Sequence, residues 1–157
     1  MTVQRLTHLG ICVSDLERSV AFYCDVFGLE EVGRLEPDVA ATSQILEIPG
    51  AKLQAVYLER DGWRIELLYF SSPGHTGSDA PRPVNRLGLT HLSFRVQDLA
   101  TITSRVEAAG GRVLENSRLA LGDDSGALFV VDPDGTRIEL IDAPGDPAAL
   151  PGSERPQ

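Results

Sequence analysis

The stretch Asp134–Leu140, DGTRIEL, decides the fold because the chain contains it twice. The earlier copy, Asp61–Leu67 (DGWRIEL), is identical at six of seven positions. Each copy reads as an Asp-Gly turn followed by a strand in which charged and apolar residues alternate. A repeated segment sets the architecture of a chain. This repeat predicts two similar halves, each presenting one carboxylate, Glu66 or Glu139, on a strand.

A second repeat precedes each of these strands. Leu6–Leu16 (LTHLGICVSDL) and Leu89–Leu99 (LTHLSFRVQDL) share seven of 11 residues, including His8 and His91. In both copies a strand with alternating apolar residues leads into a segment with helical spacing. The S-x-x-E sequence that starts at Ser14 predicts a capping box at the start of the first helix. Gly28 predicts the end of that helix.

The repeats predict an α+β fold made of two tandem βαβββ modules. We expect the first module at residues 5–71, a linker loop at 72–87, the second module at 88–142 and a flexible Pro/Gly-rich tail at 143–157. Two segments are harder to assign. Residues 36–50 are ambiguous, with a helical turn expected at 38–45, and residues 116–124 read as a loop after a short strand at 112–115.

Composition narrows the function classes. The chain has 157 residues, a hydrophobic content of 42% and a net charge of −9. The negative charge argues against nucleic acid or an anionic membrane as a partner, since both require basic surfaces. No apolar run approaches the roughly 20 residues of a membrane span. Two cysteines, Cys12 and Cys24, do not form a disulfide framework, so we expect a cytoplasmic protein with reduced thiols.

The polar residues of the repeated strands predict a metal site. Apolar residues such as Leu9 and Ile65 mark one strand face, and the opposite face carries the two histidines and two glutamates. If the two sheets curve toward one another, all four side chains enter one shared cleft. A single His or Glu on a strand is usually a structural or solvated residue. Packing alone would duplicate apolar residues instead, so the duplication favours a functional role.

The donor types indicate which ions such a site would bind. Imidazole nitrogen and carboxylate oxygen suit one divalent Zn, Ni, Co, Mn or Fe ion. Thiolate is absent from the pattern, and four protein ligands leave positions for water or substrate in a six-coordinate site. These features are typical of a catalytic rather than a structural metal. Arg64, Arg95 and Arg137 share the strand faces of the ligands and could hold an anionic group of a substrate.

The chain resembles the vicinal oxygen chelate superfamily, which includes glyoxalase I, methylmalonyl-CoA epimerase, extradiol dioxygenases and the bleomycin and fosfomycin resistance proteins. The resemblance covers residues 6–142 and is carried by THLGICVSDLERSVAFYCDVFGLE, WRIELL, LTHLSFRVQDL and DPDGTRIELID. It implies paired βαβββ modules, a homodimer and a small-molecule substrate that chelates the metal through oxygen atoms. It also implies four metal ligands: His8, Glu66, His91 and Glu139.

By this resemblance the chain is a metal-dependent lyase or isomerase that works through a metal-stabilised enolate. Glu139 or Glu66 would be both ligand and catalytic base. Cys12 stands where bacterial glyoxalase I has an arginine that helps to hold glutathione, which argues against a glutathione hemithioacetal as substrate.

Two alternatives remain open at this point. A single-domain Fe(II) extradiol-type dioxygenase would use His8, His91 and Glu139 and leave Glu66 free. A drug-binding protein of the bleomycin-resistance type would not need the metal set. The ligands could meet within one chain or across a dimer.

Overall fold

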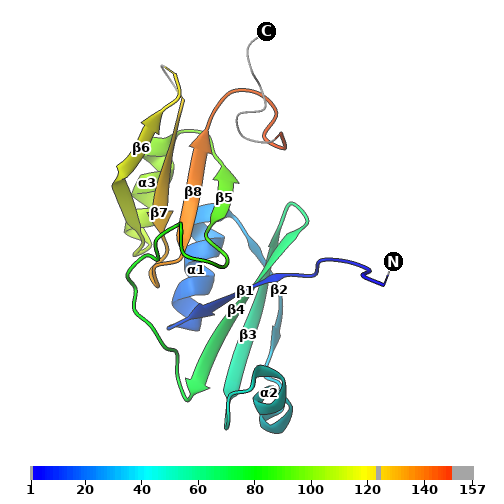
Figure 1. The fold of residues 1–157 in the computed structure, drawn as a ribbon. Helices are drawn as coiled ribbons and strands as arrows, with labels where there is room; N and C mark the ends of the chain where they lie inside the picture. Colours follow the sequence, from blue (N-terminus) through cyan, green and yellow to red (C-terminus); the bar gives the residue numbers. More distant parts are fainter. Residues whose placement is uncertain (1, 123–124, 150–157) are drawn as a thin grey trace. The chain divides into compact units, whose positions relative to one another are not determined.

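The computed structural model describes residues 2–122 and 125–149, which form two compact units, Met1–Gly77 and Ser78–Gln157 (Figure 1). The elements of the first unit are β1 (Leu9–Val13), α1 (Leu16–Phe27), β2 (Glu30–Leu35), α2 (Val39–Leu46), β3 (Lys52–Arg60) and β4 (Trp63–Ser72). Those of the second are β5 (Leu92–Arg95), α3 (Leu99–Ala108), β6 (Arg112–Ala120), β7 (Gly126–Val131) and β8 (Arg137–Asp142).

Each unit contains one four-stranded mixed sheet, and the two sheets have the same topology. The strand orders are β1-β4-β3-β2 and β5-β8-β7-β6. The first strand of each unit pairs parallel with the last, and the other pairs are antiparallel. Leu9 lies opposite Ile65 and Leu92 opposite Ile138, so the register is also repeated. The predicted α+β fold with tandem βαβββ modules is confirmed, and the first module carries one additional helix, α2.

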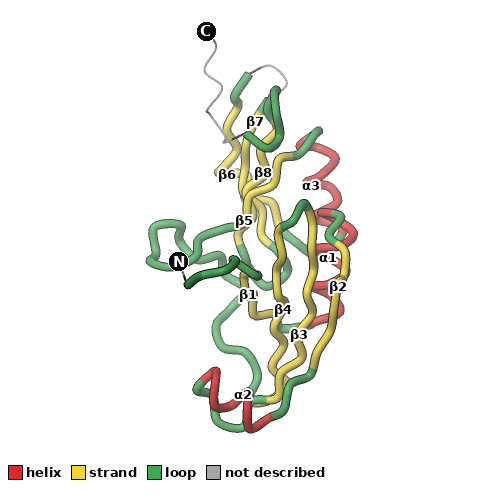
Figure 2. Tube along the Cα trace, turned by 90° about the vertical axis from the view of Figure 1, so that its right-hand side faces the viewer, coloured by secondary structure: helices red, strands yellow, loops and turns green. Residues whose placement is uncertain are grey.

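In the first unit, α1 covers one face of the sheet, and the repeated strand supplies much of the core (Figure 2). Ile65 and Leu67 of β4 alternate with charged residues, so both apolar side chains point to the helix side. Leu67 is fully buried, as is Tyr23 of α1. The largest fully buried side chains of this unit are Tyr23, Phe22, Leu58, Leu67, Val13 and Val56. Alternation therefore leaves Glu66 on the sheet face away from α1.

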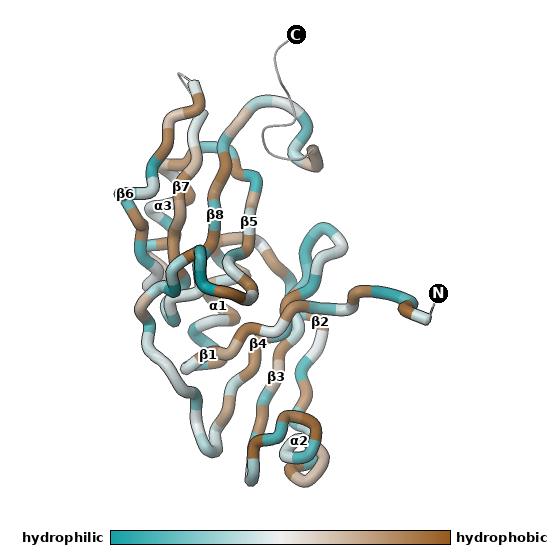
Figure 3. The backbone as a smooth tube through the Cα atoms, in the orientation of Figure 1, coloured by the Kyte–Doolittle hydropathy of each residue, from teal (hydrophilic) through white to brown (hydrophobic). Residues whose placement is uncertain are grey.

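The second unit repeats this division between α3 and its sheet. Ile138 and Leu140 of β8 are fully buried, and Glu139 lies between them on the other face. The strand β7 is apolar along its length, which Figure 3 shows as a mainly brown segment. The largest fully buried side chains of this unit are Leu128, Ile138, Leu140, Val106, Val130 and Val131. The repeated strand thus has the same function in both units, with apolar residues in the core and the carboxylate outside it.

The C-terminal end of α1 agrees with the sequence prediction, but the N-cap does not. The capping residue is Asp15, whose carboxylate accepts a hydrogen bond from the backbone N–H of Arg18 at 3.1 Å. The prediction of a capping box at Ser14 was wrong, and Ser14 instead accepts a hydrogen bond from the Arg18 guanidinium at 2.8 Å. Gly28 ends the helix in the left-handed conformation (φ 66°), as predicted.

Two further differences concern segments between the repeats. The ambiguous segment forms α2, which begins after the Asp38 cap and runs to Leu46. The strand β6 continues to Ala120, where a loop was expected, across an irregular register between Leu114 and Leu119. Ser117 bridges this irregularity, because its hydroxyl donates to the Leu114 carbonyl and accepts from the Phe129 N–H.

Residues 123–124 of the expected loop and 150–157 of the expected tail lie outside the described residues. Within residues 2–122 and 125–149, no helix is long and apolar enough to cross a membrane.

Candidate metal centre

His8 and Glu66 form a pair in the first unit. His8 lies immediately before β1, and Glu66 lies on β4 opposite Gly10. The parallel register brings His8 Nε2 to 3.1 Å from Glu66 Oε2. The other ring nitrogen, Nδ1, lies 3.0 Å from Thr7 Oγ1. The Glu66 side chain is only 14% exposed, so the carboxylate is largely sheltered from water while the histidine edge stays accessible.

His91 and Glu139 form the equivalent pair in the second unit. His91 Nε2 lies 3.7 Å from Glu139 Oε2, and its Nδ1 lies 2.9 Å from Thr90 Oγ1. Glu139 Oε2 also accepts a hydrogen bond of 2.7 Å from the Ser93 hydroxyl. The two units therefore present the same arrangement, in which Nδ1 is next to a threonine hydroxyl and Nε2 faces a carboxylate.

This arrangement fits two ligands of one metal ion. When Nδ1 carries the proton and donates a hydrogen bond to the threonine hydroxyl, Nε2 keeps a free lone pair. This is the state in which imidazole binds metals. Two ligand atoms at about 2.1 Å from an octahedral ion lie about 3 Å apart, close to the separations found here. Among residues 2–122 and 125–149, no group of three or more His, Cys, Asp or Glu side chains gathers at one point. Each unit thus contributes two of the four predicted ligands.

An aromatic residue from the neighbouring strand flanks each pair. The Tyr57 ring meets His8 edge-on at 5.4 Å between centroids, and Phe129 meets His91 in the same way at 5.2 Å. Tyr57 lies opposite Glu66 in the β3–β4 register. The Glu66 carboxylate beside it, with burial second, raises the pKa of the Tyr57 hydroxyl to about 12. The modules therefore differ here, because Phe129 lacks the hydroxyl group of Tyr57.

Comparison with known proteins agrees with this duplicated geometry. The model of the Glyoxalase/Bleomycin resistance protein/Dioxygenase superfamily matches residues 5–140. The chain belongs to this superfamily. It is similar to lactoylglutathione lyase of Salmonella typhimurium, with 32% identity over 88% of this chain and 93% of that protein. It is 27% identical to ethylmalonyl-CoA/methylmalonyl-CoA epimerase of Cereibacter sphaeroides, over 88% of this chain and 97% of that protein.

Other superfamily members differ in length or share only the fold. The chain spans 44% of Arabidopsis thaliana lactoylglutathione lyase GLX1, at 29% identity and covering 88% of this chain. A solved glyoxalase family protein from Bacillus cereus has a TM-score of 0.77 at 20% identity, over 90% of this chain and 95% of that one. These relatives act in more than one reaction, so the superfamily alone does not define the reaction of this chain.

The three arginines predicted to hold an anionic group of the substrate have different partners. Arg64 forms an ion pair with Glu59, the residue opposite it on β3. Arg95 donates hydrogen bonds to the backbone carbonyls of Ala143 and Pro144, and thereby fixes the chain after β8. Both guanidinium groups have structural partners that compete with an anionic substrate.

Arg137 occupies the position equivalent to Arg64 but has no equivalent carboxylate. Its Nε donates to the carbonyl of Arg82 at 2.7 Å, and the guanidinium lies over the Phe129 ring at 5.8 Å. Val131 stands opposite it on β7, where the first unit has Glu59. Within the described parts of the chain, Arg137 makes no ion pair with a carboxylate. Its positive charge, two residues from Glu139, is therefore not compensated by an acidic partner.

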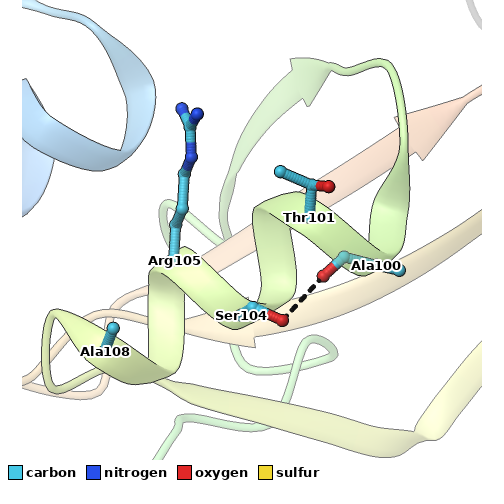
Figure 4. A pocket seen from close by; sticks show the side chains of 5 residues that line it. All are labelled: Ala100, Thr101, Ser104, Arg105 and Ala108. Atoms are coloured by element: carbon cyan, nitrogen blue, oxygen red, sulfur yellow. Dashed lines mark hydrogen bonds between the residues drawn. The ribbon is translucent and has the colours of Figure 1, made fainter.

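Cys12 and a depression on α3 are two further features of the surface. Cys12 is exposed on β1, on the same strand face as Gly10 and two residues beyond it. The depression is lined by Ala100, Thr101, Ser104, Arg105 and Ala108, as shown in Figure 4. It lies on the outer side of α3 and contains none of the predicted ligands. The small residues at four-residue spacing account for its shape.

Sequence reasoning missed the residues that hold the four ligands in place. Thr7 and Thr90 are identical members of the repeat. Because each precedes a predicted histidine ligand, this identity could have indicated that both threonines contact the histidines. Ser93 and Tyr57 had no such signal. Their equivalents in the other module are Gly10 and Phe129, so neither hydroxyl is duplicated. Their roles follow from the strand register, which a sequence repeat does not reveal.

Proposed function

We propose that this superfamily member is a divalent-metal-dependent lyase or isomerase acting on a small substrate that chelates the metal through oxygen. The observation that carries the proposal is the repeated pairing of His Nε2 with Glu Oε2, at 3.1 and 3.7 Å, with each Nδ1 next to a threonine hydroxyl. His8, Glu66, His91 and Glu139 would together hold one Zn, Ni, Co, Mn or Fe ion.

The ion would supply Lewis acidity, which stabilises negative charge that develops on a carbonyl oxygen of the substrate. The protein would move the proton. In this scheme Glu139 or Glu66 accepts a proton from the carbon next to the carbonyl, and the C–H electron pair moves toward the carbonyl oxygen. Where that carbon carries a hydroxyl group, return of the proton to the former carbonyl carbon, with transfer of the hydroxyl proton to the former carbonyl oxygen, gives an isomerisation. Return of the proton to the opposite face of the original carbon gives an epimerisation.

The first pair favours this reaction class over an extradiol dioxygenase. A dioxygenase-type site uses two histidines and one glutamate and leaves the other glutamate without a role. Here Glu66 lies closer to its histidine than Glu139 does, and its side chain is more sheltered from water. These contacts support Glu66 as a fourth ligand. They also argue against a binding protein that needs no metal set.

Arg137 is the residue that we propose for binding an anionic group of the substrate. Arg137 makes no ion pair among the described residues and donates one hydrogen bond to a carbonyl, which supports this role. Arg64 is paired with a carboxylate, and Arg95 donates three hydrogen bonds to two carbonyls. Cys12 is neutral where the superfamily resemblance places a glutathione-binding arginine. We therefore propose a small anionic 2-hydroxy- or 2-oxo-carbonyl compound as substrate rather than a glutathione hemithioacetal.

Solvent-deuterium exchange tests the reaction class. Protein loaded separately with Zn²⁺, Ni²⁺, Co²⁺ or Mn²⁺ would be incubated in D₂O with small 2-hydroxycarbonyl acids and with a methylglyoxal–glutathione mixture, and followed by NMR. We expect metal-dependent incorporation of deuterium next to the carbonyl of a small acid. Oxygen consumption with catechols and no exchange would instead establish a dioxygenase. Exchange confined to the glutathione mixture would overturn the substrate proposal but support the reaction class.

We also propose that the protein is a homodimer in the cytoplasm. Subunit mixing distinguishes a site within one chain from a site shared by two. His8→Ala and His91→Ala variants would be mixed and assayed for metal binding, with sedimentation analysis of the assembly. Recovery of high-affinity binding in the mixture requires ligands from two chains, and no recovery indicates that each site is built from one chain.

A further inference from the structure

A short segment at the start of the second unit, residues 79–82, lies against the turn that precedes β8. Arg112, the first residue of β6, binds Asp79 twice: its Nη1 lies 3.1 Å from the carboxylate, and its Nη2 lies 2.7 Å from the backbone carbonyl oxygen. The Arg82 carbonyl accepts a hydrogen bond of 2.7 Å from Arg137 Nε. We call residues 79–82 the strap, because arginines of β6 and β8 hold its two ends.

The strap packs most closely against Gly135. This glycine is buried, and a Cβ atom placed on it would lie 2.7 Å from the Asp79 carbonyl carbon, closer than side chains approach backbone atoms. Gly62 is its equivalent in the repeated Asp-Gly turn. It is exposed, and a Cβ atom there would have no neighbour among the described residues within 4 Å. Both glycines have a positive φ, 86° and 78°, so the two positions differ in packing rather than in φ.

The hydrogen bond to the strap leaves the outer end of Arg137 available to a ligand. Arg137 and Glu139 alternate with buried residues on β8, so both side chains lie on the sheet face away from α3. A guanidinium has five N–H donors, and Nε uses one of them on the Arg82 carbonyl. No described residue accepts a hydrogen bond from the two Nη atoms, whose N–H groups can bind a carboxylate in a bidentate manner. The Phe129 ring lies under the guanidinium at 5.8 Å.

We propose that the strap holds Arg137 in the orientation that binds an anionic group of the substrate, with Arg112 and Gly135 as positioning residues. The inference rests on the proposed function, which assigns the anionic group to Arg137 and the chelating oxygens to the metal. A free arginine side chain loses rotational freedom when it binds a ligand. Because the strap already restricts Arg137, less freedom is lost and the anion is bound more tightly. The fitting substrate has one carboxylate apart from its chelating oxygens.

Two ligands that differ by one carboxylate measure this contact. Tartronate chelates a metal through its hydroxyl and one carboxylate and leaves a second carboxylate for Arg137, whereas glycolate has only the chelating pair. Calorimetric titration of Co²⁺-loaded protein would give the ratio of the two affinities. We expect wild type to bind tartronate about tenfold or more tightly than glycolate, and Arg137→Ala to lose most of this preference, because a charge-assisted hydrogen bond is removed.

The strap is tested by two variants, each with a matched control. Gly135→Ala and Arg112→Ala should each reduce the preference for tartronate about threefold to tenfold and leave the affinity for glycolate within about twofold. Gly62→Ala places alanine at the same kind of positive φ but without a clash. Arg118→Ala removes another arginine of β6, which pairs with Glu115 on its own strand. Both controls should keep the wild-type ratio.

¹⁵N NMR of the metal-free protein follows the strap without metal or ligand. The Arg137 Nε–H signal, assigned by its absence in Arg137→Lys, should exchange slowly with water in wild type, because Nε donates to the Arg82 carbonyl. Its exchange should be faster in Gly135→Ala and Arg112→Ala and unchanged in Gly62→Ala. Thermal unfolding would confirm that the variants are folded. Arg112 is exposed, so Arg112→Ala tests the strap even if Gly135→Ala does not fold.

The results distinguish failure of the inference from failure of the proposed function. If wild type binds no Co²⁺ or does not prefer tartronate, or if Arg137→Ala keeps the preference, the proposed function fails in that respect and the inference fails with it. If Arg137→Ala loses the preference but Gly135→Ala and Arg112→Ala keep it, the inference alone is overturned. An equal loss in Gly62→Ala, or an Arg137 Nε–H that exchanges alike in wild type and both strap variants, would also overturn it.

Discussion

Replacing Thr90 by valine tests how the histidine ligands are prepared for metal binding. The Thr90 hydroxyl lies 2.9 Å from His91 Nδ1, and Thr7 lies at 3.0 Å from His8 Nδ1 in the other module. Valine has the shape of threonine but cannot form this hydrogen bond. The imidazole of Thr90→Val would lose the partner that keeps the proton on Nδ1 and the lone pair on Nε2, which faces Glu139.

The structure indicates the size of the effect. Loss of an outer-shell partner commonly lowers metal affinity about tenfold to hundredfold. Water can replace the threonine, because the His91 side chain is 30% exposed and Thr90 itself is exposed. We therefore expect the lower end of that range, about a tenfold loss of affinity or about 1.4 kcal/mol. Thr90→Ser keeps the hydroxyl and should remain within about threefold of wild type.

Calorimetric titration of the metal-free proteins with Co²⁺ would measure these affinities, with Thr7→Val as the equivalent change in the first module. Similar losses for Thr7→Val and Thr90→Val would show that the repeat has one role in both halves. The threonine hydroxyls do not prepare the histidines for metal binding if both valine variants bind Co²⁺ as tightly as wild type. The same conclusion follows if Thr90→Ser loses as much affinity as Thr90→Val.

Two predictions concern other parts of the chain. Arg137→Ala should raise KM for an anionic substrate about tenfold or more. Arg64→Ala should change KM much less, because Arg64 already pairs with Glu59. Equal increases in KM for the two variants, measured by steady-state kinetics, would contradict this prediction. The hydroxyl and N–H of Thr101 lower the pKa of Asp98 below its ordinary 3.8. Asp98 therefore stabilises the fold above that ordinary pKa, and its contribution is lost as pH falls through the folded-state pKa. Asp98 is the N-cap of α3. Asp98→Asn, measured by thermal unfolding across acidic pH, should lose less stability on acidification than wild type, and an unchanged acid limb would refute the role of this cap.

The repeats predicted the fold correctly because they specify both a strand register and a core. Ile65 and Leu67, and their equivalents Ile138 and Leu140, are apolar at alternate positions, and a period of two fixes which face of each strand is buried. The same alternation placed Glu66 and Glu139 on the opposite faces.

The features that sequence did not reveal depend on contacts between distant residues. Ser117 extends β6 by bridging Leu114 and Phe129, a link that no local pattern encodes. Tyr57 reaches Glu66 only through the β3–β4 register. The arginines looked equivalent in the sequence, but the residues opposite them, Glu59 and Val131, make their environments different. Such differences arise from residues on neighbouring strands. The repeated segments do not include these residues, so comparing the two copies does not reveal them.

If the two His–Glu pairs together bind one divalent metal ion, the protein should contain one ion per chain, and its metal stoichiometry can be measured. Protein purified without chelator would be analysed for metal content and titrated with Co²⁺, alongside His8→Ala, Glu66→Gln, His91→Ala and Glu139→Gln. We predict one ion per chain in wild type and a large loss of affinity in all four variants. Retention of wild-type affinity by Glu66→Gln, or a wild-type protein that takes up no divalent metal, would contradict a metal site built from these four residues.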